Sequence, residues 1–73
     1  MRLSELRYGQ TGQIRDISGT DALSIRLMDL GFLPPAQVVR IFSAPGGDPI
    51  VVRLRGYTLS LRREEAERVE VQA

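Results

Sequence analysis

The stretch IVVRLRGYTLSL, residues 50–61, decides the fold, because apolar side chains occupy every second position on both sides of Gly56. If Arg55 and Gly56 form a tight turn, each apolar residue before the turn faces an apolar residue after it. The predicted pairs are Leu54 with Tyr57, Val52 with Leu59 and Ile50 with Leu61. This agreement between the two halves predicts a β-hairpin. A three-residue turn with glycine in the left-handed position is the alternative.

Three further segments outside the hairpin are predicted to be strands. They are residues 11–17 (TGQIRDI), residues 37–43 (QVVRIFS) and a short last strand around Val69 and Val71. In the first of them, Ile14 and Ile17 lie three positions apart, and Gly12 is predicted to mark a bulge that corrects the register. The sequence does not show which side chains of residues 37–43 point to the core, because apolar residues occur at both odd and even positions.

One helix is predicted from about Asp21 to Leu30, between the first two strands. Thr20 is the expected N-cap and Gly31 the left-handed C-cap, and the prolines at 34 and 35 prevent continuation. One stripe of the helix is apolar and should face the core; it consists of Leu23, Leu27 and Leu30. Single helical turns are expected at residues 3–6 and 64–67.

Five short strands and one helix in 73 residues leave room for a single domain, residues 1–73. A sheet of this size must curl to bury its apolar face. The sequence therefore predicts a mainly β fold: a small, partly open barrel of SH3-like type, with the helix of residues 21–30 inserted between the first two strands.

The composition narrows the function. The chain has no cysteine and no histidine, so thiolate metal sites and the commonest general base are excluded. No nucleophile has an activating base, and no phosphate-binding glycine motif is present, so we expect no enzymatic activity, no cofactor and no metal site. Ten arginines against nine acidic residues give a net charge of +1, which provides no strong basic field for nucleic acid. No apolar run can cross a membrane and no signal peptide is present, so we expect a cytoplasmic protein.

The candidate site lies on the second face of the helix. Ile25 and Met28 are neighbours there, outside the leucine stripe, and Phe32 follows the helix. One interpretation is that both sides of the helix rest on the sheet; the other is an exposed apolar patch for a partner protein, centred on these three residues. A charged rim would surround the patch, formed by Asp21, Arg26 and Asp29.

A second candidate contact is the loop APGGDP, residues 44–49. It is longer than a hairpin needs, and long loops often carry function. Gly46, Gly47 and Asp48 are the residues at its tip that we expect to touch a partner.

Three other groups favour structural roles. The acidic residues Glu64, Glu65 and Glu67 are expected to form a solvated turn and not a metal site. Arg62 and Arg63 are expected to pair with them. Of the four aromatic residues, at least two are expected in the core; the four are Tyr8, Phe32, Phe42 and Tyr57.

The chain resembles the FeoA family, small cytoplasmic accessory proteins of bacterial ferrous iron transport. The matching motifs are the opening LSELRYGQTGQI, RLMDLGF at 26–32 with Pro34 after it, APGGDP at 44–49 and RGYTLSLRREEA at 55–66. Two positions depart from the family pattern: Pro35 replaces the usual glycine, and Gly46 replaces a larger apolar residue. The resemblance implies an SH3-like barrel that supports FeoB, the membrane GTPase that moves ferrous iron.

Other functions remain open as alternatives. One is a barrel that binds nucleic acid, and another is a carrier of ferrous iron, which would have only carboxylates and carbonyls as ligands. The same barrel occurs in metal-dependent repressors, but no helix-turn-helix accompanies it in this sequence, so a free-standing module is the preferred interpretation. Exposed strand edges favour weak self-association.

Overall fold

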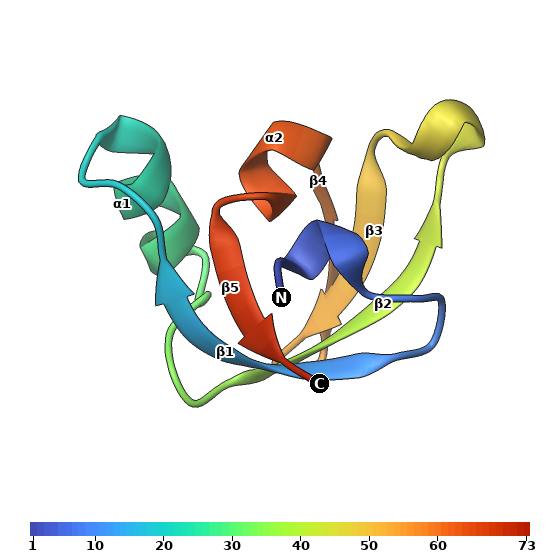
Figure 1. Cartoon of the computed structure of the whole chain (residues 1–73), viewed down its shortest axis with the longest axis horizontal. Helices are drawn as coiled ribbons and strands as arrows, with labels where there is room; N and C mark the ends of the chain where they lie inside the picture. Colours follow the sequence, from blue (N-terminus) through green and yellow to red (C-terminus); the bar gives the residue numbers. More distant parts are fainter.

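A computed structural model describes all 73 residues. Five antiparallel strands form one curled sheet in the order β4-β3-β2-β1-β5. The strands are β1 (Thr11–Ile17), β2 (Gln37–Ser43), β3 (Ile50–Leu54), β4 (Tyr57–Leu61) and β5 (Val69–Gln72). Figure 1 shows the sheet wrapping around the centre of the molecule, with helix α1 (Ala22–Asp29) between β1 and β2. The predicted mainly β architecture with one inserted helix is confirmed.

The β3–β4 hairpin has the predicted register. Leu54 pairs with Tyr57, Val52 with Leu59 and Ile50 with Leu61, without a bulge. Both turn residues have a positive φ, 51° at Arg55 and 86° at Gly56. Positive φ at both central positions is the geometry of a type I′ turn, whose twist matches that of the strands. The two-residue turn is therefore confirmed, and the three-residue alternative is wrong.

The irregularity in β1 lies at a different residue from the one predicted. The register with β5 shifts between Ile14 and Asp16, and this bulge lets Ile14 and Ile17 both face the core. Gly12 pairs regularly with Val38, so its assignment as the bulge is wrong. Instead, a Cβ atom at Gly12 would lie 3.1 Å from the Val71 side chain, so glycine permits a close approach of β1 and β5.

A second bulge resolves the ambiguous facing of β2. The register with β3 shifts between Arg40 and Phe42. Val38, before the bulge, is buried, whereas Phe42, after it, is exposed. The strand therefore changes the face that it presents to the core, which explains why its apolar residues do not alternate.

Helix α1 begins one residue later than predicted, because its N-cap is Asp21 and not Thr20. It also ends one residue earlier, at Asp29, so its C-cap is Leu30 and the left-handed Gly31 follows the cap. The Asp21 carboxylate accepts a hydrogen bond from the Ser24 backbone N–H at 3.3 Å. Of the predicted leucine stripe, Leu27 is fully buried, and Leu23 and Leu30 pack half-buried against the core. The stripe is confirmed as the face that docks the helix.

Three short helices complete the chain: η1 (Leu3–Glu5), η2 (Pro45–Gly47) and α2 (Arg63–Ala66). The core is one cluster of 14 buried apolar residues. It draws on η1, α2 and every strand, so the N-terminal and C-terminal segments pack on the same centre, as Figure 1 shows. None of the helices is long and apolar enough to cross a membrane.

Candidate protein-interaction surface

Ile25 and Met28 form an exposed apolar pair on α1, which we call the α1 patch. Ile25 is 55% exposed and Met28 is 36% exposed, while Leu27 between them is buried. The buried stripe already docks the helix on the sheet, so the packing of the fold does not account for these two side chains. Exposed apolar pairs of this kind are suited to contact with another protein. Of the two interpretations, the one in which both sides of the helix rest on the sheet is wrong.

Phe32 does not belong to this patch. Its side chain is fully buried and is part of the core cluster. The chain reverses at Gly31, whose φ is 108°, and the Phe32 N–H donates to the Leu27 carbonyl at 3.1 Å. This reversal turns the ring inward beneath the helix. The expectation that Phe32 extends the patch on the surface is therefore wrong.

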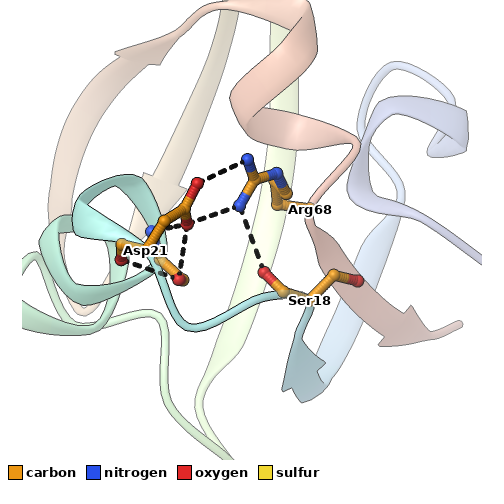
Figure 2. A network of polar contacts seen from close by, with 4 residues as sticks. Ser18, Asp21 and Arg68 are labelled. Atoms are coloured by element: carbon orange, nitrogen blue, oxygen red, sulfur yellow. Dashed lines mark hydrogen bonds and ion pairs between the residues drawn. The ribbon is translucent and has the colours of Figure 1, made fainter.

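An ion pair joins the N-terminal end of α1 to Arg68, which lies between α2 and β5 (Figure 2). The Arg68 guanidinium donates to both oxygens of the Asp21 carboxylate, at 2.8 and 2.9 Å, and to the Ser18 carbonyl at 3.4 Å. These bonds, with those from Ser24, hold the pKa of Asp21 well below its ordinary value. The carboxylate in turn raises the pKa of Arg68.

A second ion pair joins α1 to α2. Arg26 Nη1 lies 2.9 Å from Oε2 of Glu65, which is buried. The other oxygen of Glu65 accepts the backbone N–H of Arg62 at 2.8 Å. Glu65 is thus a structural carboxylate, so the prediction of a wholly solvated acidic turn is wrong for this residue. Two of the three predicted rim charges, Asp21 and Arg26, hold the helix in place, and Asp29 forms no ion pair.

The loop of residues 44–49 is tied to α2. Asp48 Oδ1 accepts the Arg63 backbone N–H at 3.1 Å, and Arg63 Nη2 donates to the Gly47 carbonyl at 3.1 Å. Arg62 pairs with Asp48 at 3.6 Å, so the expected pairing of these arginines with the glutamates of α2 is wrong. Gly46 is exposed and a Cβ atom there would meet nothing within 4 Å, so it forms the free tip.

The structure does not bring the two predicted contacts together. In Figure 1, α1 lies at the left and the loop, in yellow, at the upper right, toward opposite ends of the long axis. That axis measures 30 Å. A single small binding site cannot include both the α1 patch and the tip of the loop.

The aromatic residues lie mostly on the surface, and the sequence-based expectation that at least two are core residues is wrong. Only Phe32 is buried; Tyr8 is 66% exposed, Phe42 51% and Tyr57 43%. The Arg40 guanidinium lies 5.1 Å from the centre of the Tyr8 ring, and the Tyr57 hydroxyl donates to the Leu30 carbonyl at the end of α1. Bulges and turns place these rings outside, and periodicity alone does not reveal such changes.

The surface has no pocket, and no group of three or more acidic side chains converges. The arrangement offers apolar and charged contact surfaces on a rigid sheet.

The fold is that of a small mainly β domain with one curled five-stranded sheet. A family model described as the FeoA domain matches residues 1–73, and the chain belongs to the FeoA family. The chain is 36% identical over 72 residues to the Fe(2+) transport protein A/Fe(2+) transporter FeoB fusion protein of Porphyromonas gingivalis. The match covers 99% of this chain and 8% of that protein, so the chain spans a small part of this relative.

Solved structures agree on the fold. FeoA of Stenotrophomonas maltophilia, crystallised with zinc and described as an SH3 domain protein, superposes with a TM-score of 0.88 at 33% identity. The match covers 99% of this chain and 89% of that one, so the predicted SH3-like fold is confirmed. A manganese-dependent transcriptional repressor also superposes, with a TM-score of 0.88 at 20% identity over 100% of this chain and 41% of its own. That likeness shows the fold alone.

Proposed function

We propose that this chain is an accessory protein of ferrous iron transport that binds an FeoB-type membrane GTPase through the α1 patch. The observation that carries the proposal is the exposure of Ile25 and Met28 on a helix whose other face already docks it to the sheet. Methionine adapts to irregular partner surfaces, and an apolar centre within a polar surround has the anatomy of a protein interface.

The fusion in Porphyromonas gingivalis supports the choice of partner. In that relative the name of the protein joins an FeoA part and an FeoB part in one chain. A covalent link raises the effective concentration of one part at the other, which is useful when two parts work in contact. We propose the same contact with an FeoB-type protein for the present chain, in which residues 1–73 act as a separate module.

The proposal places the chain in the cytoplasm, held at the inner face of the membrane by its partner. It assigns the chain no catalytic step, no cofactor and no resident metal, and its effect on transport is exerted through contact. The loop tip at Gly46, Gly47 and Asp48 is a second contact for a large partner, because it lies toward the far end of the molecule from α1.

The test is a binding titration with the cytoplasmic GTPase domain of the cognate FeoB, with and without guanine nucleotide. The variant Ile25→Gln/Met28→Gln introduces a residue of good helix propensity at both positions and removes the apolar surface. We expect it to bind at least about tenfold more weakly, which is about 1.4 kcal/mol. The control is Tyr8→Gln, which removes an aromatic side chain that is 66% exposed elsewhere on the surface.

Surface substitutions change stability by less than about 0.5 kcal/mol, so both variants should melt close to the wild type. A double variant that folds and binds like the wild type would contradict the α1 patch as the interface. Equal losses in the double variant and in Tyr8→Gln would also contradict it.

A further inference from the structure

The outer edge of β4 has backbone groups that nothing in the chain uses. In a hairpin with a two-residue turn, the residues that flank the turn exchange both backbone hydrogen bonds, and the pattern alternates from there. Leu54 and Tyr57 flank this turn, so the N–H and C=O groups of Thr58 and Ser60 point away from β3. No other strand pairs with β4, and no hydrogen bond outside the ladder reaches these two residues. Both are exposed.

This edge also lacks the features that protect open edges in most proteins. Proline, charged side chains and bulges commonly prevent an edge strand from pairing with another chain. The five residues of β4, YTLSL, contain no proline and no charge, and their register with β3 is regular. The edge therefore presents a regular ladder of free donors and acceptors at the spacing of an extended polypeptide.

The charge around the edge is positive. Residues 50–63 carry four arginines and no acidic residue, whereas the rest of the chain carries six arginines and nine acidic residues. Arg55 and Arg62 flank the two ends of β4, and Arg53 pairs with Thr58 across the ladder. All of them are exposed, and Arg62 also lies 3.6 Å from the Asp48 carboxylate, so Arg53 and Arg55 are the arginines without an acidic partner. An occupant with acidic side chains at both ends of its extended segment would complement this charge.

The same charge disfavours a second copy of this chain. An antiparallel copy paired about Leu59 would bring its arginines at 62 and 63 next to Gly56 and Arg55 of the first. Like charges at both ends of so short a ladder would oppose the pairing. Nucleic acid would satisfy the arginines, but its sugar-phosphate backbone carries no N–H and C=O groups at strand spacing to pair with Thr58 and Ser60.

From the free ladder and the surrounding charge we propose that the outer edge of β4 binds an extended, acidic segment of a partner protein by strand addition. Main-chain hydrogen bonds from Thr58 and Ser60 supply the affinity, and the flanking arginines select acidic segments. This site goes beyond the α1 patch, because it requires neither Ile25 nor Met28. The two surfaces adjoin, since the Tyr57 hydroxyl at the start of β4 bonds the Leu30 carbonyl at the end of α1.

The first test uses a synthetic peptide of about seven residues, the length of a short strand, with aspartate at both ends and alternating threonine and valine between them. We expect its addition to the full chain to shift the backbone amide signals of Thr58 and Ser60 and to slow their hydrogen exchange. Two matched peptides are the controls. Lysine in place of aspartate should weaken binding at least about tenfold, and N-methylation of alternate amides should abolish it.

The second test changes the protein. Proline is tolerated at an edge strand where the N–H faces solvent, so Ser60→Pro should fold and yet lose an outward donor. We expect it to bind the acidic peptide at least about tenfold more weakly, whereas Ser60→Ala, which keeps the donor, should bind within about twofold of the wild type. The Ile25→Gln/Met28→Gln variant should bind the peptide like the wild type, which separates this site from the α1 patch.

Several results would overturn the proposal. They are equal binding of the lysine or the N-methylated peptide, no binding of the acidic peptide at millimolar concentration, and amide protection that rises with protein concentration without peptide, which would indicate a second copy. If a single-stranded oligonucleotide at equal charge concentration displaced the acidic peptide, the arginines would be a nucleic-acid site. That result would also overturn the proposal. If Ser60→Pro fails to fold, the N-methylated peptide decides the question on the wild-type chain.

Discussion

The two edges of the sheet differ, although the same short chain builds both. At the β5 edge the N-terminal residues cover the strand: the Val71 N–H donates to the Met1 carbonyl at 2.7 Å, and Arg2 forms a bridge with Glu70. The Met1 ammonium adds an ion pair with Glu70 at 2.8 Å. At the β4 edge, Thr58 and Ser60 face solvent with no element beside them.

This difference shows how a small domain can combine stability with an open binding edge. The covered edge is continuous with the core, because Leu3 and Leu6 of the N-terminal segment are fully buried. The open edge contributes residues to the core only through the β3–β4 hairpin. Disruption of the covered side should therefore unfold the chain, whereas changes at the open side should leave the fold intact.

The largest expected effect is that of Leu3→Ala. This substitution leaves a cavity beneath η1 on the covered side and should lower the free energy of unfolding by about 2–5 kcal/mol. The matched change on the open side is Leu59→Ala, which should cost about 1 kcal/mol, since Leu59 is only half-buried. Urea denaturation of both variants measures the difference. Equal costs would contradict the contrast between the edges.

A smaller effect is expected at the hairpin turn. Gly56 has a φ of 86° and open space around it, so a side chain there meets no atoms but strains the backbone. Gly56→Val should cost about 1–2 kcal/mol and weaken the whole open edge. Gly56→Asn, which tolerates this conformation better, is the control and should retain most of the stability. Thermal unfolding of both variants checks the prediction. A Gly56→Val variant as stable as Gly56→Asn would contradict it.

An acid-dependent effect is expected at the Asp21–Arg68 ion pair, beside the start of β5. The pKa of Asp21 is lowered in the folded state, so its bonds with Arg68 contribute stability above the unfolded pKa of about 4. That contribution is lost as the pH falls through the folded pKa. In the wild type the midpoint of urea denaturation should therefore fall as the pH decreases below about 4, and in Asp21→Asn this fall should be smaller. Asp29→Asn, at an exposed aspartate without an ion pair, should keep the wild-type slope; equal slopes in both variants would be evidence against this account.

Much of the fold could be predicted from the sequence because local chemistry determines it. The ranges of β1 and β2 follow from their β-branched and aromatic residues, and the register of the hairpin follows from alternation and from Gly56 at the turn. Long-range geometry accounts for the errors. The reversal at Gly31 buries Phe32, and the register shift before Phe42 exposes that ring, and neither is visible in periodicity.

The candidate site was predictable only in part. Ile25 and Met28 were identified because they lie off the leucine stripe, and the structure shows that they are exposed. Two other features depend on residues far apart in the chain. They are the hydrogen bond between Asp48 and α2 and the cover of the β5 edge by the N-terminal residues. The open edge of β4 could be found only once the covered edge was known, because a strand pattern does not show what lies beside it.

Amide hydrogen exchange of the free protein, resolved residue by residue, tests the difference between the edges most directly. Val71 and Ser60 are the matched pair, since both N–H groups point outward from an edge strand, but only that of Val71 has an acceptor, the Met1 carbonyl. The account predicts slow exchange at Val71 and fast exchange at Thr58 and Ser60, at a rate independent of protein concentration. Exchange at Thr58 and Ser60 as slow as at Val71 would contradict it.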